Sequence, residues 1–234
     1  MTTQAKKGYK GLGMEGAIAR WYARNTGKDL GEFRQHAADL ATRLPGGGDV
    51  LEVAPGPGYL AIELAKLGPY RVVGLDISHT FVRMAAENAA AAGVAVTFRH
   101  GNASEMPFAA DSFDLIVCRA AFKNFSEPVR ALCEMHRVLR PGGTALVLDL
   151  RPDAPPAAID AYVNGKGLSW VNRVLTKLAF RCMLLKRAYS QEQFRQMASE
   201  TPFDGCTIRE DGLGLEVSLA KEATGATPAG SPGR

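Results

Sequence analysis

The chain has 234 residues, of which 46% are hydrophobic and 22% charged, so it resembles a globular protein long enough to bury a full core. Its 28 basic and 24 acidic residues give a net charge of +4, too mild to suggest the dense basic patch of a nucleic-acid-binding protein. The four cysteines are widely spaced without a CxxC pair, which argues against a metal knuckle and a disulfide scaffold.

Targeting signals are not evident in the sequence. The first 13 residues contain lysines and glycines but no apolar core, unlike a signal peptide. No run approaches the ~20 apolar residues that span a bilayer. We therefore expect a cytoplasmic protein that binds no metal.

Residues 1–44 form the first predicted segment, an N-terminal helical cover. Residues 1–13 are expected to be mobile, whereas residues 15–44 have the periodicity of one or two helices. Ile18, Trp21 and Tyr22 fall at the i, i+3 and i+4 positions of one helix face. This spacing is explained either by core packing or by an aromatic cover, with Tyr22 closing over a ligand.

Residues 45–151 alternate between strand and helix patterns, which predicts a doubly wound, mostly parallel sheet. The predicted strands are 50–53, 72–75, 94–100, 113–118 and 144–149, and the predicted helices are 59–67, 78–92 and 127–139. Ligands of such sheets bind beyond the carboxyl ends of the strands. The residues just after each strand are therefore the candidates for a binding site.

Residues 152–203 read as a mostly helical insertion or lid. Within 170–187, the cations Arg173, Lys177 and Arg181 repeat every four residues, and apolar residues occupy other faces. Three interpretations stay open. The segment is a cover helix with a solvated basic face, a lid over a hydrophobic acceptor, or a weak contact with an anionic membrane surface.

Residues 204–221 read as a β-hairpin, with strands 206–210 and 215–219 joined by an Asp-Gly turn. This antiparallel pair would complete a seven-stranded sheet. Residues 222–234 are rich in Gly, Pro, Ala, Thr and Ser, and we expect them to be disordered.

A strand, a glycine turn and a helix meet around residues 50–67. Gly56 and Gly58 would let a ligand approach backbone N–H groups beside a helix N-terminus. Asp76 follows Gly56 by 20 residues, the spacing at which a carboxylate receives hydrogen bonds from ribose hydroxyls. The stretch therefore predicts a site for a ribose-bearing cofactor.

The glycines alone also fit a dinucleotide site, but two details favour another ligand. Pro55 and Pro57 have no backbone N–H to offer a pyrophosphate. Glu52 at the strand end would repel a phosphate and attract a cation. S-adenosylmethionine (SAM) has a ribose, an ammonium group and a sulfonium but no phosphate, so it fits these features better than NAD.

Several motifs together resemble the class I SAM-dependent methyltransferases. Glu52-x-Ala54-x-Gly56-x-Gly58 resembles their first motif, with Ala54 in place of the usual first glycine, and Asp76 matches the second. Gly101-Asn102-Ala103 and Met106-Pro107-Phe108 resemble the third, in which Asp is more usual than Asn102. Ser112 to Ile116 and Arg137 to Gly143 are similar to the fourth strand and to the segment before the fifth. The closest likeness is to the small-molecule branch that includes the ubiquinone/menaquinone C-methyltransferases.

This resemblance implies a Rossmann-like methyltransferase fold and cofactor-binding roles for particular residues. Ile77 and Ala103 would flank the adenine, and Asn102 would hydrogen-bond its amino edge, since an amide oxygen accepts as a carboxylate does. The complete expected cofactor set is Glu52, Ala54, Pro55, Gly56, Gly58, Asp76, Ile77, Asn102, Ala103 and Arg119. The product would be S-adenosylhomocysteine.

The acceptor side is expected to include Tyr22, Phe122 and Lys123. Lys123 follows the fourth strand, where many members of the resembled family have a His pair. It either orients an anionic acceptor or points to solvent. Asp149 ends the fifth strand and acts either as a base or as a hydrogen-bond acceptor for a loop. We treat Lys123 and Asp149 as the candidate catalytic residues.

The expected function is in-line methyl transfer from SAM to a small, hydrophobic or aromatic acceptor. An RNA methyltransferase, a non-catalytic SAM-binding protein and a nicotinamide oxidoreductase are the alternatives. Cys118 to Phe122 lack the Asn/Asp-Pro-Pro-Tyr/Phe type of motif expected of an RNA methyltransferase. The acceptor, the methylated atom and the oligomeric state are not readable from the sequence.

Overall fold

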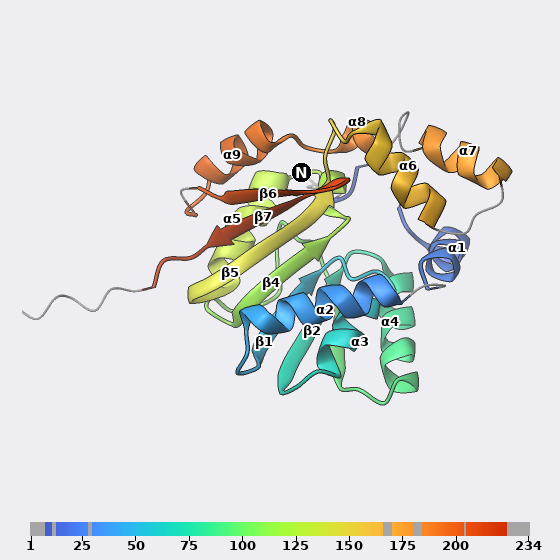
Figure 1. Ribbon diagram of the computed structural model, residues 1–234. Helices are drawn as coiled ribbons and strands as arrows, with labels where there is room; N and C mark the ends of the chain where they lie inside the picture. Colours follow the sequence, from blue (N-terminus) through green and yellow to red (C-terminus); the bar gives the residue numbers. More distant parts are fainter. Residues whose placement is uncertain are drawn as a thin grey trace, which may run out of the picture.

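A computed structural model describes residues 8–10, 13–27, 30–165, 170–179, 184–203 and 205–223. Seven strands form one sheet with the order β3-β2-β1-β4-β5-β7-β6 (Figure 1). The strands are β1 (Gly48–Val53), β2 (Tyr70–Asp76), β3 (Val96–His100), β4 (Phe113–Arg119), β5 (Leu139–Leu150), β6 (Thr207–Asp211) and β7 (Gly214–Ala220). The helices of the described residues are α1 (Gly16–Thr26), α2 (Gly31–Arg43), α3 (Tyr59–Ala65), α4 (His79–Ala91), the 3-10 helix η1 (Phe122–Asn124), α5 (Pro128–Val138), α6 (Pro156–Gly165), α7 (Trp170–Ala179), α8 (Leu185–Arg187) and α9 (Gln191–Ser199).

The sheet has the predicted topology. Strands β1 to β5 pair in parallel, whereas β7 pairs antiparallel with both β5 and β6. The C-terminal hairpin therefore completes a seven-stranded, mostly parallel sheet, as the sequence predicted. The expected disorder of 222–234 concerns mainly residues outside the described ranges. The division of the chain into five segments stays a prediction.

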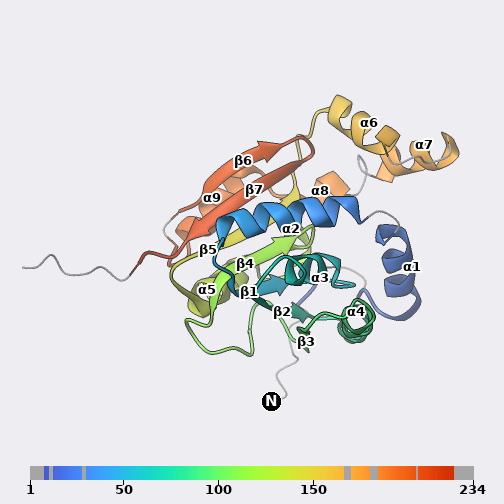
Figure 2. The same ribbon diagram turned by 60° about the horizontal axis from the view of Figure 1, so that its bottom comes forward.

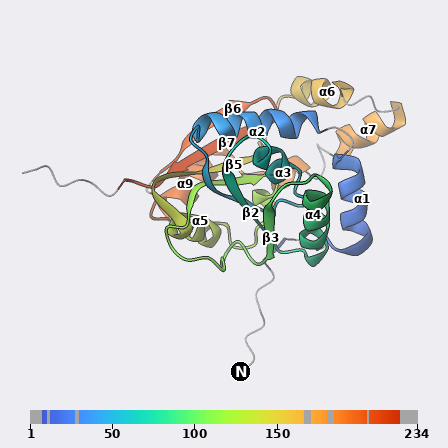
Figure 3. The same ribbon diagram turned by 90° about the horizontal axis from the view of Figure 1, so that it is seen from below.

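Helices cover both faces of the sheet, because alternate strand residues point to opposite sides. Leu51 and Val53 of β1 join a buried cluster with α5 and α9. Val50 joins a second cluster with α2 and α3 on the other face. Figures 2 and 3 show these two helical layers with the sheet between them. Apolar runs buried on both sides are what a central parallel sheet requires.

The remaining helices gather at one end of the sheet. Helices α1, α6, α7 and α8 lie at the end toward which β4 and β5 point (Figure 1). Ile159 and Val163 of α6 and Leu185 of α8 form a small apolar cluster separate from the two main ones. This cover lies where ligands of open parallel sheets bind.

Helix α7 contacts α6 through one cation of the expected basic face. Lys177 Nζ lies 2.7 Å from Asp160 of α6. Trp170, Val174 and Leu178 are exposed. Arg181 lies outside the described residues. In the part of the chain that the structure describes, no helix is both long and apolar enough to cross a membrane.

Candidate functional site: the carboxyl ends of β1, β2, β4 and β5

The turn after β1 has three residues in the left-handed backbone region. Gly56 and Gly58 have φ angles of 56° and 81°, and Gly58 is the N-cap of α3. A Cβ atom at Gly58 would lie 2.7 Å from the Phe98 ring, so only glycine fits there. Ala54 has a φ of 59°, which a side chain disfavours. The chain therefore keeps the glycine-type turn even where the resembled family's glycine is replaced.

Glu52 lies at the end of β1 and is buried, with 4% of its surface exposed. Its Oε2 accepts a hydrogen bond of 2.9 Å from the N–H of Ala61, in the first turn of α3. Desolvation by burial raises the pKa of Glu52 to about 7, although the Ala61 hydrogen bond and the charge of Arg119 oppose the rise. A cationic ligand would favour the ionised form of this carboxyl group.

Asp76 ends β2 and is 5% exposed. Its Oδ2 accepts from the N–H of Gly56 at 3.0 Å, and its Oδ1 accepts from the N–H of Ser78 at 2.8 Å. The spacing of 20 residues thus reflects direct contact between the acid and the glycine turn. Burial raises the pKa of Asp76 to about 6, because two hydrogen bonds do not fully replace its hydration.

Ile77 and Asn102 lie beside the N-terminal segment Gly8–Lys10. A Cβ atom at Gly8 would be 2.7 Å from both the Asn102 Nδ2 and the Ile77 Cδ1. Asn102 Oδ1 accepts a hydrogen bond of 3.0 Å from the N–H of Ser104, and this bond orients the Asn102 side-chain amide. Ala103, the residue between these two in the chain, is half-buried. The residues expected around the adenine are therefore adjacent, but their binding role stays a prediction.

Residues 8–10, which we call the strap, cross the loop after β4. Tyr9 forms an antiparallel bridge with Phe125, and the N–H of Lys10 donates to the Asn124 oxygen at 2.7 Å. Lys10 Nζ also donates to the Tyr189 hydroxyl at 2.6 Å. The expectation of a mobile segment is therefore wrong at residues 8–10, because backbone pairing holds them. Residues 1–7, 11 and 12 lie outside the described part.

Tyr22 and Arg119 lie on the other side of the glycine turn. The Tyr22 Cε1 would be 3.9 Å from a Cβ atom at Gly56, and its ring meets Phe81 edge-on at 5.8 Å. Arg119 lies over the Phe33 ring and donates to Glu32 at 3.3 Å, while its charge also acts on Glu52 and Tyr22. The structure thus brings both residues near the turn.

Lys123 and Asp149 form a buried ion pair. Their side chains are 6% and 3% exposed, and Lys123 Nζ lies 2.6 Å from Asp149 Oδ1. Lys123 Nζ also donates to the Ala120 oxygen at 2.9 Å. The other carboxylate oxygen, Asp149 Oδ2, accepts from the backbone N–H of Lys123 at 3.0 Å. The interpretation of Lys123 as a solvent-facing side chain is wrong, and the pair fastens η1 to the end of β5.

Phe122, expected in the acceptor pocket, is completely buried. It packs against Phe125, Tyr189 and Phe194, at ring-centroid distances of 5.2, 6.0 and 5.5 Å. Tyr189 was missed by the sequence reasoning. Tyr189 directly precedes the capping box of Ser190 and Gln193. A hydrophobic residue at that position commonly packs on the first turn of the helix, as Tyr189 does on Phe194, so this position could have predicted the contact.

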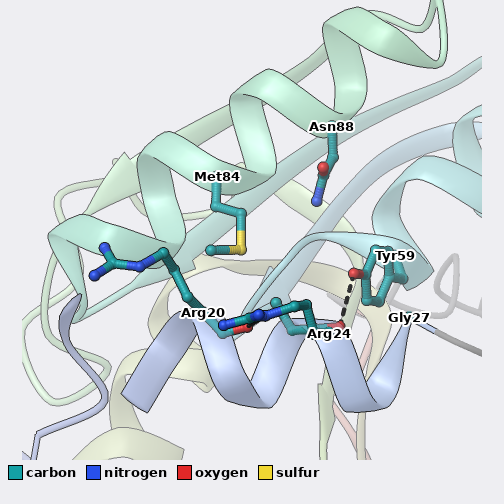
Figure 4. Close-up of a pocket in the computed structure, with 7 residues that line it drawn as sticks. Arg20, Arg24, Gly27, Tyr59, Met84 and Asn88 are labelled. Carbon is teal, nitrogen blue, oxygen red and sulfur yellow. Dashed lines mark hydrogen bonds between the residues drawn. The ribbon is translucent and has the colours of Figure 1, made fainter. Parts of the chain in front are cut away.

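A surface groove of about 430 Å³ lies between α1, α3 and α4 (Figure 4). Arg20 and Arg24 of α1 face Met84 and Asn88 of α4 across it, and Tyr59 donates to the Ala23 oxygen at its end. Glu52, Asp76 and Asn102 do not line it. The groove is therefore distinct from the candidate cofactor site.

The donor set of the site fits SAM. The buried carboxylates of Glu52 and Asp76 lie on either side of the glycine turn and suit a cationic ligand. Because Pro55 and Pro57 have no backbone N–H, the turn offers few hydrogen-bond donors to a phosphate. Ser126 Oγ, in the loop beside the strap, is buried without a hydrogen-bond partner among the described residues. Within the described residues, no group of three or more His, Cys, Asp or Glu side chains could hold a metal ion.

A model of the methyltransferase domain family matches residues 51–147. This match and the sheet order place that part of the chain among the class I SAM-dependent methyltransferases. Within that class the chain resembles quinone methyltransferases. It is 36% identical over 129 residues to demethylmenaquinone methyltransferase from Deinococcus radiodurans, covering 55% of this chain and 53% of that protein. The corresponding protein from Thermus thermophilus is 37% identical over 132 residues, covering 56% and 58%.

The chain thus spans little more than half the length of these two relatives. Among solved structures, a Methanococcus maripaludis protein assigned to the SAM-dependent methyltransferases has a TM-score of 0.70 and 19% identity, with 97% and 99% of the two chains covered. A SAM-dependent methyltransferase from Aquifex aeolicus has a TM-score of 0.59 and 16% identity, with 82% and 97% covered. These two likenesses concern the fold alone.

Proposed function

We propose that the protein transfers a methyl group from SAM to a small, hydrophobic or aromatic acceptor. The observation that carries the proposal is the pair of buried acids, Glu52 and Asp76, which contact opposite ends of the glycine turn within the methyltransferase domain. A site that buries two carboxyl groups with raised pKa values favours a cationic ligand over a phosphate-bearing one.

SAM, when bound, supplies a methyl group already activated by its sulfonium. The protein must then hold the reactants in line and exclude water, because proximity can supply much of the rate. In this proposal Asp76 receives the ribose hydroxyls of SAM, and Glu52 balances its positive charge. Tyr22 and the strap cover the glycine turn and the Ile77–Asn102 side.

Lys123 and Asp149 act in this proposal as positioning residues. Asp149 already receives both the ammonium and the backbone N–H of Lys123 and the N–H of Leu150. Three of its four acceptor sites are therefore engaged, which disfavours proton abstraction. The pair would instead hold the loop after β4 at the acceptor side.

A quinol is the first acceptor class to test, because the relatives named above are demethylmenaquinone methyltransferases. We propose no nucleic-acid substrate. The cytoplasmic location expected from the sequence stays a prediction.

The test is calorimetric titration with SAM, S-adenosylhomocysteine and NADH in parallel. We expect binding of the two adenosyl ligands and none of NADH. Asp76→Asn should weaken SAM binding by about 10- to 100-fold, since the amide has no charge and keeps only one acceptor oxygen for the ribose hydroxyls. Glu63→Gln is the matched control, because Glu63 is a buried acid on α3 that pairs with Lys66 outside the site.

Unchanged SAM affinity in Asp76→Asn would refute the assignment of Asp76, and binding of NADH alone would refute the proposed cofactor. If the adenosyl ligands bind, an acceptor screen of quinols, phenols and amines should follow, with S-adenosylhomocysteine formation as the signal. Turnover with a quinol would support the acceptor class, and turnover only with RNA would contradict it.

A further inference from the structure

Helix α7 contacts α6 through an ion pair and exposes an apolar stripe. Lys177 pairs with Asp160 of α6 at 2.7 Å. Trp170, Val174 and Leu178, spaced by four residues and hence on one stripe, are 72%, 58% and 56% exposed. An ordinary surface helix buries its apolar stripe and solvates its charges. Here three apolar side chains of one stripe are exposed instead, and they form an apolar ridge.

Helix α1 carries a second apolar surface beside this ridge. Its Trp21 is 64% exposed, and Ile18, one turn earlier, is also exposed. Figures 1, 2 and 3 all show α1 and α7 as neighbours at the same end of the molecule. The chain contains only two tryptophans, Trp21 and Trp170, and both are exposed at this end. Tryptophan is the side chain most characteristic of the membrane–water interface.

The same helices concentrate positive charge. Helices α1, α6, α7 and α8 contain six basic residues and one acid, a net charge of +5, whereas the whole chain has a net charge of +4. The basic residues are Arg20, Arg24, Arg173, Lys177, Lys186 and Arg187, and the acid is Asp160. Arg20 and Arg24 also line the surface groove of Figure 4. An apolar ridge among unbalanced cations is complementary to anionic lipid headgroups.

We propose that α1, α7 and α8 form a face that docks on an anionic lipid bilayer, with Trp21, Trp170, Val174 and Leu178 entering the interfacial layer. A second copy of the chain fits this face less well. A two-fold interface would bring two copies of this cationic patch together, and their charges would repel each other. The proposal does not depend on methyl transfer and can be tested without a methyl acceptor.

The experiment is flotation of the full chain with phosphatidylcholine vesicles, with and without phosphatidylglycerol, while tryptophan fluorescence is recorded. We expect binding and a blue shift with the anionic vesicles, and weaker binding as salt is raised, since the cations are screened. Because both tryptophans lie on the proposed face, their emission reports directly on its insertion.

Two variants separate the contributions. Trp170→Ser, Val174→Ser and Leu178→Ser combined should reduce vesicle affinity by about tenfold or more, because the apolar ridge is removed. Arg20→Ser with Arg24→Ser should reduce it several-fold and weaken its salt dependence. The controls are Leu67→Ser, an exposed leucine after α3, and Arg83→Ser, an exposed arginine of α4. Both should bind as the unmodified chain does.

Three results would overturn the proposal. One is the absence of flotation and blue shift with anionic vesicles at low salt. The second is equal loss in the ridge and control variants. The third is a blue shift that needs no lipid and follows protein concentration, with a doubled mass by light scattering, because this would identify a second copy as the occupant.

Discussion

Glu52 and Asp76 both accept hydrogen bonds from the backbone of the protein itself. Glu52 accepts from Ala61, and Asp76 accepts from Gly56 and Ser78, so both shape the glycine turn before any ligand arrives. The sequence suggested either a ligand role or a turn-fixing role for Glu52. The hydrogen bond to Ala61 shows that the turn-fixing contact exists. The raised pKa of Glu52 indicates that this hydrogen bond does not fully compensate for the loss of hydration on burial.

The first prediction concerns pH and SAM binding. Burial raises the pKa of Glu52 to about 7, so near neutral pH about half of the molecules carry a protonated Glu52. A cationic ligand favours the carboxylate, so SAM affinity should increase between about pH 6 and about pH 8, with release of a proton. Calorimetry in two buffers of different ionisation enthalpy measures this proton release directly.

Glu52→Gln should bind SAM about tenfold more weakly and lose most of this pH dependence. Stability provides an independent readout. The folded state keeps the Glu52 proton above pH 4.5, where the unfolded state has lost it, so the free energy of unfolding should fall as pH rises from 4.5 through about 7. Equal slopes for Glu52→Gln and the unmodified chain would contradict the assignment.

At the scale of elements, the positions of the strands and the caps of two helices were readable from the sequence. Ser78 caps α4, and Ser190 with Gln193 forms the capping box of α9. The start of β5, by contrast, was not readable from the sequence. Residues 140–143 read as a loop but belong to the strand, because a register shift between Phe113 and Leu115 lets Leu139 pair with Phe113. Such a bulge depends on the partner strand and leaves no local pattern.

Helix α7 shows a second limit. Its periodicity revealed an apolar stripe and a cationic stripe, but periodicity does not say which stripe faces the protein. The contact between Lys177 and Asp160, 17 positions earlier in the chain, depends on how α6 and α7 pack and is not visible in the periodicity. Sequence reasoning therefore found both stripes and left their orientation open.

The second prediction concerns the buried pair that joins η1 to β5. Lys123→Met leaves the Asp149 carboxylate buried without its cation, so the free energy of unfolding should fall by about 3 kcal/mol. Adding Asp149→Asn should recover a large part of the loss. Arg71→Met, which breaks an exposed pair with Asp49, should cost less than about 1 kcal/mol. Urea denaturation measures all three.

If the pair positions the loop, Lys123→Met should also raise the acceptor KM while the SAM Kd stays unchanged. A fall in kcat together with an altered pH profile and no change in KM would instead assign a catalytic role to Lys123. Unchanged turnover and unchanged acceptor KM would remove both interpretations of its part in the reaction.

At the scale of the whole molecule, the strap links segments that are distant in the chain. Gly8 to Lys10 contact Asn102, the loop at Asn124, and Tyr189, which is 179 positions from Lys10. The polar, glycine-containing sequence of this segment has no strand or helix pattern. Its order comes from backbone pairing with residues more than 100 positions away, so it could not be inferred locally.

The third prediction follows from the place of the strap beside Ile77 and Asn102. A chain lacking residues 1–10 should keep its fold, because residues 8–10 do not belong to the buried clusters of the sheet. Its SAM affinity should fall by about tenfold, mainly through faster dissociation, since the cover over the adenine side is lost. Stopped-flow competition gives the dissociation rate. Removal of residues 224–234 is the matched truncation and should leave that rate unchanged.

Tyr189→Phe gives a finer test of the same idea. It removes the hydrogen bond to Lys10 Nζ but keeps the aromatic packing on Phe194, so the dissociation rate should increase only a few-fold. If the strap governs dissociation, combining Tyr189→Phe with the truncation should add nothing, because their common contact is already gone. An additive effect would mean that Tyr189 acts on SAM through the lid and independently of the strap.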